Sequence, residues 1–236
     1  MKPRRSGVRR LPLLVVIDGP AGSGKSVITR RLAKALKVPF LYTGAMYRAV
    51  TLRAVRRGVR LTDGPALVRI ARSLDIRFRT GVDGRVRVLV GGRDATAELN
   101  HPDISRLTSA HVANQVMVRR ALVERQRRYL TGRGLVAEGR DCGSIVFPAA
   151  PYKFYLTASF AERVRRRYTD LRKAGVDVDL KRIRRDMARR DREDRGRATG
   201  ALRVMPDAWV VDNTRLRQEQ TIAAMLRRIC GKCSTG

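Results

Sequence analysis

The chain has 236 residues, of which 43% are hydrophobic, and a formal net charge of +31 at pH 7. A chain of this length and hydrophobic content can bury a sizeable core, as one large α/β domain or two small ones, which argues against a disordered protein. No apolar run approaches the ~20 residues of a membrane span, and the arginine-rich start lacks the apolar region of a secretory signal. We therefore expect a soluble, cytoplasmic protein without a membrane partner.

The positive charge raises the question of a nucleic-acid partner, because clustered Lys and Arg release counterions from a phosphate backbone. Only eight of the 52 basic residues are lysines, and the arginines run from Arg4 to Arg228 without one dominant block. This spread indicates a general arginine bias. We expect weak, salt-sensitive contact with polyanions and no specific nucleic-acid partner.

The cysteines do not indicate a structural or metal-binding framework. There are three, Cys142, Cys230 and Cys233, which is too few and an odd number for a set of disulfides. Cys230 and Cys233 form a single C-x-x-C, and the two histidines, His101 and His111, lie far away in sequence. The pattern therefore disfavours a zinc or redox site.

A phosphate-binding pattern lies near the start of the chain. Residues 1–12 are basic and lack apolar periodicity, so we expect a flexible arm, and the apolar residues 13–17 then predict a buried strand. The glycines that follow let backbone N–H groups surround an anion at the N-terminus of a predicted helix. We expect Lys25 to meet the β- and γ-phosphates of ATP and the Ser26 hydroxyl to bind Mg²⁺. The predicted ATP-binding residues are Gly19, Pro20, Ala21, Gly22, Ser23, Gly24, Lys25, Ser26 and Val27.

The next helix carries a second motif. A strand is expected at 38–41, and Thr43 is expected to cap a helix that runs to Arg57. The helix starts with the segment Tyr42-Thr43-Gly44-Ala45-Met46-Tyr47-Arg48. Together with the preceding loop, this segment closely resembles the bacterial cytidylate kinase family, in which a Thr/Ser-Gly-Ala-Met-Tyr-Arg segment lines the nucleoside monophosphate site. The resemblance implies substrate contacts from Thr43 and Arg48, although the family normally has Asp where this chain has Tyr42.

Alternating residues on both sides of Asp83-Gly84 predict a hairpin of strands 76–79 and 85–90, with a third short strand at 93–96. This unit looks like the antiparallel insertion of long bacterial cytidylate kinases, so we place a monophosphate-binding insertion at about 60–115. A plain surface hairpin is the alternative. Helical periodicity follows over 104–130, where the resemblance implies a sugar contact from Asn114 and a cytosine contact from Arg119. An exposed helix arginine is the alternative for Arg119.

The apolar run 134–137 predicts a further strand. Arg140 and Asp141 follow at its carboxyl end, where open α/β sheets place ligand contacts. The surrounding Gly-Arg-Asp-x-Gly segment also resembles the family, which implies that both residues bind substrate. The alternative is a structural ion pair between the two.

The remaining elements continue the alternation of strand and helix. We expect strands at 153–157 and 208–212, a helix with a Ser159/Glu162 capping box, a helix at 180–190 and a closing helix at 216–229. The mixed-charge run 190–197 has the composition of a lid that closes over reacting phosphates, although such runs are often solvated surface. The family's Arg-Asp-x-x-Asp-x-x-Arg lid, at about 181–200 here, is matched at Arg190, Asp194 and Arg197.

These elements predict an α/β fold, a P-loop kinase with a parallel five-stranded sheet flanked by helices, a small antiparallel NMP-binding insertion and a helical lid. One domain is expected at 13–229, followed by a tail at 230–236, in a monomer. The resemblance implies Mg²⁺-dependent transfer of the γ-phosphate of ATP to CMP or dCMP. The expected catalytic residues are Lys25, Arg140, Asp194 and Arg197.

Two other functions stay open at this point. Another small-molecule P-loop kinase, acting on UMP, AMP or shikimate, shares the donor loop. In the second alternative, the nucleotide is a switch and the basic surface binds RNA.

Overall fold

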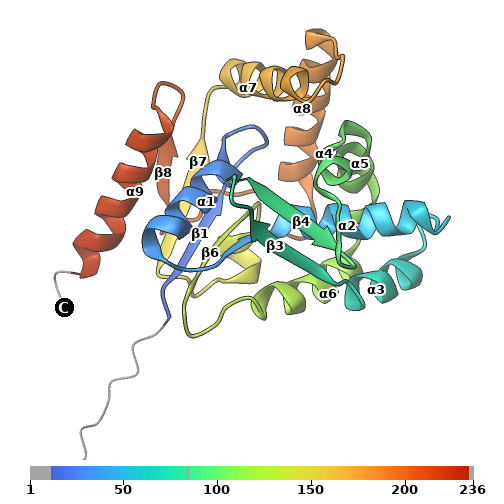
Figure 1. The fold of residues 1–236 in the computed structure, drawn as a ribbon, viewed down its shortest axis with the longest axis horizontal. Coiled ribbons are helices and arrows are strands. Elements are labelled where there is room, and N and C mark those ends of the chain that lie inside the picture. Colours follow the sequence, from blue (N-terminus) through green and yellow to red (C-terminus); the bar gives the residue numbers. More distant parts are fainter. Residues whose placement is uncertain (1–11, 84, 234–236) are drawn as a thin grey trace, which may run out of the picture.

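The computed structural model describes residues 12–83 and 85–233 (Figure 1). Apart from Pro12, the predicted arm lies outside the described residues, as does Gly84 of the predicted hairpin turn. None of the helices in the described ranges combines the length and the hydropathy that crossing a lipid bilayer requires.

A parallel sheet of five strands forms the centre of the molecule and confirms the predicted fold class. The strands are β1 (Leu14–Asp18), β2 (Phe40–Tyr42), β6 (Leu135–Gly139), β7 (Tyr152–Thr157) and β8 (Trp209–Asp212). Their order is β2-β6-β1-β7-β8, and every pair is parallel. All five residues of β1 and of β6 are buried, as a strand covered on both faces requires.

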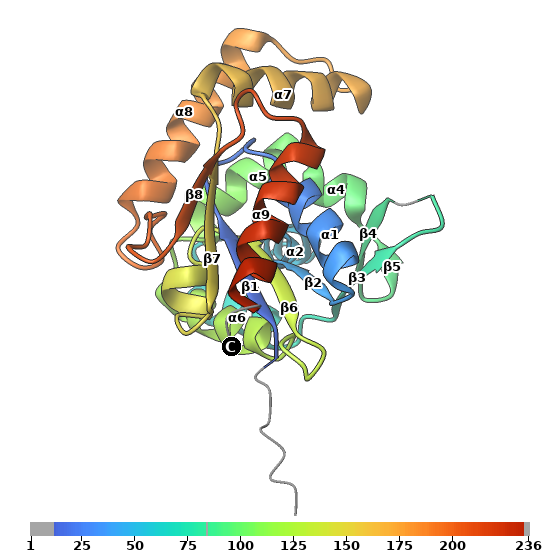
Figure 2. The same cartoon turned by 90° about the vertical axis from the view of Figure 1, so that its left-hand side faces the viewer.

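Helices cover the two faces of this sheet. On one face lie α1 (Lys25–Leu36) and α9 (Gln218–Cys233), whose Ile28, Leu32 and Met225 pack against Val15 and Ile17 of β1 (Figure 2). The other face is covered by α2 (Thr43–Arg56) and α6 (Val116–Arg127), through side chains such as Met46 and Leu122. The closing helix, α9, was expected at 216–229; it begins two residues later and continues to Cys233.

The insertion contains three antiparallel strands, β3 (Ile76–Thr80), β4 (Val86–Val90) and β5 (Arg93–Asp94), in the predicted order. The helices around them are α3 (Gly64–Arg72), α4 (Thr96–Asn100), α5 (Pro102–Leu107) and the π-helical turn η1 (Thr108–Val112). An aromatic cluster joins the two sheets, because Phe78 of β3 packs within 5.6 Å of the Tyr42 ring and 6.2 Å of the Phe40 ring. The insertion is therefore anchored next to the start of α2.

Two helices stand over the carboxyl edge of the main sheet, where parallel strands end (Figure 1). They are α7 (Phe160–Lys173) and α8 (Leu180–Gly196). Half of the predicted capping box of α7 is present: the Glu162 N–H donates to the Ser159 hydroxyl, but the Ser159 N–H donates to Thr214 and the Glu162 carboxylate pairs with Arg165 and Arg166. The run 190–197 is helical up to Gly196, so its charges project from a helix. The buried Arg163 of α7 pairs with Asp191 of α8 and donates to the Ala21 carbonyl of the loop after β1.

One local prediction was wrong. Tyr42, rather than Thr43, occupies the N-cap position of α2, and no side chain caps this helix. The Thr43 hydroxyl instead donates to the Glu138 carbonyl at 2.8 Å. Thr43 therefore hydrogen-bonds to β6, the strand next to β2, instead of capping α2.

Candidate active site

The loop between β1 and α1 has the backbone shape of an anion-binding turn. Gly22 and Gly24 adopt φ angles of 75° and 88°, which side chains other than glycine rarely adopt. The Lys25 ammonium donates to the Pro20 carbonyl at 2.7 Å and to the Ser23 hydroxyl at 3.4 Å. Burial, reinforced by the nearby Arg140, lowers the pKa of Lys25 to about 7. A buried, poorly stabilised ammonium at this position favours an anionic ligand.

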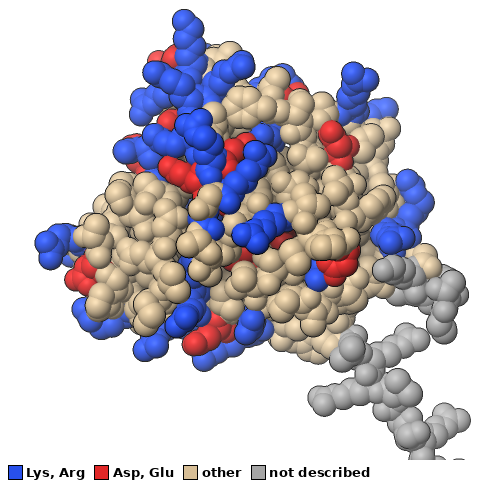
Figure 3. Space-filling model, turned by 180° about the vertical axis from the view of Figure 1, so that it is seen from behind, with Lys and Arg blue, Asp and Glu red and all other residues tan. Residues whose placement is uncertain are grey.

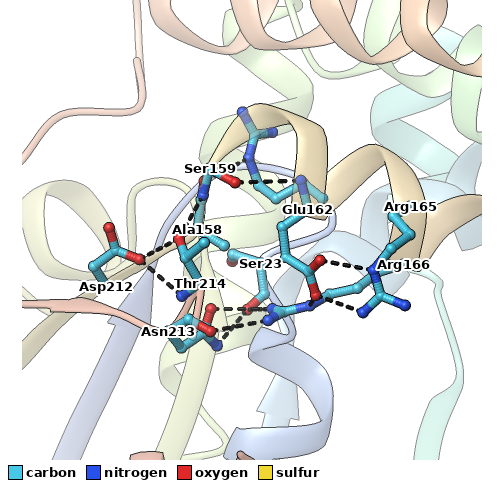
Figure 4. Close-up of polar contacts among 10 residues, drawn as sticks. Ser23, Ala158, Ser159, Glu162, Arg165, Arg166, Asp212, Asn213 and Thr214 are labelled. Atoms are coloured by element: carbon cyan, nitrogen blue, oxygen red, sulfur yellow. Dashed lines mark hydrogen bonds and ion pairs between the residues drawn. The ribbon is translucent and has the colours of Figure 1, made fainter. Parts of the chain in front are cut away.

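A network behind the loop holds its shape (Figure 4). The Asn213 amide donates to the Ser23 carbonyl at 3.0 Å, and Arg166 of α7 donates to the side-chain and main-chain oxygens of Asn213 at 3.0 and 2.9 Å. Glu162 accepts from Arg166 at 2.8 Å and keeps its guanidinium in place. Our sequence analysis missed Arg166 and Asn213. Asn213 did offer a signal, because it directly follows β8 at the ligand-binding edge of the sheet.

Oxygen atoms gather beside Ser26. Its hydroxyl donates to Glu138 Oε1 at 3.2 Å, and its carbonyl accepts from the Tyr42 hydroxyl at 2.9 Å. The neighbouring Asp18 accepts from the N–H groups of Cys142 and Gly143 at 2.9 and 2.7 Å. Burial raises the pKa of Asp18 to about 6, despite these two hydrogen bonds. Asp18 and Glu138 were missed, although both are acidic residues at the carboxyl ends of buried strands.

A cluster of arginines faces this end of the loop from three elements. Asp194 of α8 accepts from Arg140 at 2.6 Å and from Arg197 at 2.5 Å. Burial disfavours its charged form, but the surrounding guanidiniums outweigh it and hold the pKa of Asp194 below its usual range.

Two further arginines of this cluster lack such a partner. Burial, and then neighbouring cations such as Arg140, lower the pKa of Arg48 and of Arg190 to about 10, although Asp194 and Glu138 act in the opposite direction. The Nε atoms of Arg48 and Arg190 are buried and have no hydrogen-bond partner. The cluster therefore has unused donors and excess positive charge, as a phosphate-binding site does.

Arg119 and Asp141 form a buried ion pair on the other side of Arg140. The exposed fraction of each residue is only 3%. Arg119 also donates from Nη1 to the Ala113 carbonyl at 2.9 Å and lies over the Tyr47 ring, whereas its buried Nε has no partner. Arg119 is thus not the exposed arginine of the alternative interpretation. The proposed ion pair between Arg140 and Asp141 is also wrong, because each pairs elsewhere.

One cavity of about 1880 Å³ brings most of the predicted site residues together. Its lining includes Ala21, Gly22, Gly24, Lys25, Ser26, Val27, Thr43, Arg48, Arg119, Arg140, Asp141, Arg190, Asp194 and Arg197. Gly19, Pro20, Ser23 and Asn114 are not among the lining residues. Asn114 is exposed, donates to the Ser109 and Ala110 carbonyls and accepts from Arg197 at 3.3 Å.

Positive side chains crowd the surface over α7 and α8, with acidic side chains between them (Figure 3). Because Arg140, Arg190 and Arg197 line the cavity, an anionic ligand would enter it through a positive potential.

The chain is similar to known proteins over most of its length. The family model described as cytidylate kinase matches residues 15–230. A cytidylate kinase of Pelotomaculum thermopropionicum is 42% identical over 215 residues, which cover 91% of this chain and 95% of the relative. A cytidylate kinase of Azotobacter vinelandii is 39% identical over 226 residues, covering 95% and 98%. Among solved structures, a shikimate kinase from Bacteroides thetaiotaomicron overlaps with a TM-score of 0.44 at 10% identity, covering 94% and 98%.

Proposed function

Because the chain belongs to the cytidylate kinase family, we propose that it transfers the γ-phosphate of ATP to CMP or dCMP, giving ADP and CDP or dCDP. One observation carries this proposal. A single cavity holds an anion-binding loop, a cluster of arginines with unused donors and, beyond them, a buried donor–acceptor pair. In this order, the loop corresponds to the phosphates of ATP, the arginine cluster to the phosphate of CMP, and the buried pair to the cytosine base.

The loop and Lys25 bind the ATP phosphates, and the residues beside them fit Mg²⁺. The Ser26 hydroxyl lies next to the Glu138 carboxylate, so the donor set consists of oxygen atoms, which Mg²⁺ prefers. No group of three or more His, Cys, Asp or Glu side chains suited to a metal occurs in residues 12–83 and 85–233. This agrees with an ion held by one or two protein oxygens plus substrate phosphates. When bound, Mg²⁺ would neutralise charge on the β- and γ-phosphates.

Arg48, Arg140, Arg190 and Arg197 clamp the acceptor phosphate with charge-assisted hydrogen bonds. The acceptor is already an anion, so direct in-line transfer needs positioning and charge neutralisation and no covalent intermediate. Asp194 fixes the orientation of Arg140 and Arg197 by accepting from both. The run 190–197 acts as a lid that excludes water. A sugar contact from Asn114, which accepts from Arg197 outside the cavity lining, would require its side chain to turn toward the cavity.

Arg119 and Asp141 read the base. Cytosine has an amino donor at position 4 and an acceptor at N3, whereas uracil has a carbonyl and an N–H at these positions. A carboxylate therefore accepts from cytosine and repels uracil, and a guanidinium donates to N3 or O2 of cytosine. Mispairing typically costs about 1–3 kcal/mol for each group, which for two groups predicts roughly 10²–10⁴ in kcat/KM between CMP and UMP. Thr43 adds a weaker hydroxyl contact.

The test is a coupled ADP-release assay over CMP, dCMP, UMP, AMP, GMP and shikimate, with the parent and Asp141→Ala. We expect CMP and dCMP to be good substrates of the parent and UMP to be a poor one. In Asp141→Ala, the ratio of kcat/KM for CMP to that for UMP should decrease, mainly because kcat/KM for CMP falls. Equal use of UMP by the parent, or an unchanged ratio in the variant, contradicts the assignment of the base-reading residues. Turnover of none of these acceptors, together with salt-resistant RNA binding, would favour the RNA-binding alternative.

A further inference from the structure

Gly200 lies against the buried pair of Arg119 and Asp141. The chain leaves α8 at Gly196, and the Leu202 N–H then donates to the Asp194 carbonyl at 2.7 Å. This hydrogen bond folds the segment after α8 back over the cavity. Gly200 is buried there, with a φ of +70°.

The space on the side-chain side of Gly200 is fully occupied. A Cβ atom built at this position would overlap Arg119 Nη2, and it would lie 2.5 Å from Asp141 Oδ2 and 2.6 Å from Arg119 Cζ. Non-bonded Cβ atoms do not approach heavy atoms so closely, so a side chain at position 200 requires a shift of the pair or of the chain segment that carries Gly200.

The pair has little room to move away. The Arg119 guanidinium is held by the Ala113 carbonyl at 2.9 Å, by Asp141 and by the Tyr47 ring, whose centroid lies 5.3 Å from its Cζ. Displacing Arg119 therefore breaks at least one of these contacts. Because both members are almost completely buried, a broken contact leaves a costly unpaired polar group unless that group turns into the cavity that both residues line.

We propose that Gly200 is a specificity-determining residue, whose bare backbone lets Arg119 and Asp141 close into the rigid donor–acceptor pair that selects cytosine. The inference rests on the proposed function. Discrimination between cytosine and uracil requires the donor and the acceptor to stay at a fixed separation, since each base offers a fixed hydrogen-bonding edge. A side chain at position 200 disturbs the contact that holds the two groups at this separation.

The charge balance of the pair points the same way. Burial raises the pKa of Asp141, and Arg119, followed by Arg197, counteracts this effect. Separating Arg119 from Asp141 therefore favours the protonated carboxyl group. A protonated carboxyl can donate to the position-4 carbonyl of uracil, which a carboxylate cannot do.

The test compares Gly200→Ala with Gly58→Ala. Gly58 has a nearly equal φ of +65°, but no atom lies within 4 Å of a Cβ built there, so this control carries the backbone strain without the overlap. The measurement is kcat/KM for CMP and for UMP on one preparation, because their ratio does not depend on the fraction of folded enzyme. We expect the CMP/UMP ratio to fall at least ~10-fold in Gly200→Ala and to stay within about twofold in Gly58→Ala. An unchanged ratio in Gly200→Ala overturns the inference.

A background that lacks both members of the pair separates the contact from other effects of the substitution. In an Arg119→Ala, Asp141→Ala background, adding Gly200→Ala should leave the CMP/UMP ratio unchanged, because both side chains that a Cβ at position 200 would meet are absent. Should Gly200→Ala alone not fold, recovery of folded protein in this triple variant supports the contact, and failure to recover overturns it. A parent without preference for CMP contradicts the proposed base reading and the inference with it. A selective parent with an unaffected Gly200→Ala variant contradicts the inference alone.

Discussion

Arg190 should lower the stability of the substrate-free protein while supporting its activity. It is half-buried, its Nε has no hydrogen-bond partner, and its nearest charges include Arg140 and Arg48 as well as Asp194. Without Arg190, Asp194 keeps two partners, because Arg140 and Arg197 both donate to it, although Arg190 also helps to hold its pKa low. Removing the charge of Arg190 therefore relieves repulsion without leaving an unpaired carboxylate. We predict that Arg190→Met stabilises the free protein and impairs catalysis.

The size of the effect follows from the pKa of Arg190, which burial and then the neighbouring cations lower from 12.5 to about 10. At pH 7.5 the group is charged in the folded and the unfolded state, so the folded state bears the whole penalty. A shift of about 2.5 units corresponds to roughly 3 kcal/mol as an upper limit. Because Arg190 keeps some contact with solvent, we expect a gain of about 1–2 kcal/mol in the free energy of unfolding. Met has a similar helix propensity and adds no charge.

Urea unfolding at pH 7.5 measures this gain, and Arg189→Met is the matched control. Arg189 is exposed on the same helix and forms ion pairs with Asp186 and Glu193, so its loss should cost at most about 1 kcal/mol. The two variants are thus expected to shift stability in opposite directions. Loss of a charge-assisted contact to the transferring phosphates should lower kcat/KM of Arg190→Met at least ~10²-fold. A variant less stable than the parent, or one with full activity, would refute the reasoning.

Three further predictions follow from the same site. Lys25→Ala should remain folded, as judged by circular dichroism, with phosphoryl transfer reduced by orders of magnitude, and unchanged turnover contradicts the donor site. Since burial raises the pKa of Asp18 from 3.8 to about 6, the folded protein binds this proton more tightly, and Asp18 makes stability fall as the pH rises from about 4 to 6. In urea unfolding between about pH 4 and 6, the free energy of unfolding of Asp18→Asn should rise relative to that of the parent by up to about 3 kcal/mol. A difference between the two proteins that does not change with pH would count against the raised pKa of Asp18. Amides of 190–197 should exchange faster in the free protein than with ATP and CMP bound, and equal protection argues against a lid.

The main sheet was predictable because its signal is local. The apolar residues of β1 and the glycines after it lie within a dozen consecutive positions, and the burial that they imply is present. Helix α3 was missed although its signal is also local, since Asp63 accepts from the Ala66 N–H at 2.9 Å and Pro65 stands in the first turn. That error came from overlooking a start signal.

The pairings within the site were beyond reach from the sequence. Arg140 meets Asp194, 54 positions away, and Arg119 meets Asp141, 22 positions away. The adjacent charges of Arg140 and Asp141 suggest a local ion pair in the sequence. In the folded chain they follow the end of β6 and pair with residues of other elements, Asp194 and Arg119. The overlap at Gly200 depends in the same way on a turn that only the folded chain defines.

The charged run at the end of α8 shows how a structure separates a functional charge from a structural one. As sequence, 190–197 is compatible with solvated surface, yet Asp191 and Asp194 are buried. Burying a carboxylate is costly unless it is paired, and Arg163 pairs with the first while Arg140 and Arg197 pair with the second. Folding therefore accounts for these two acids. It does not account for Arg190, a largely desolvated cation with an unused donor beside other cations. An anion in the cavity would make such an arrangement favourable, and Arg190, more than the paired residues around it, is therefore the basis for proposing a phosphate contact from α8.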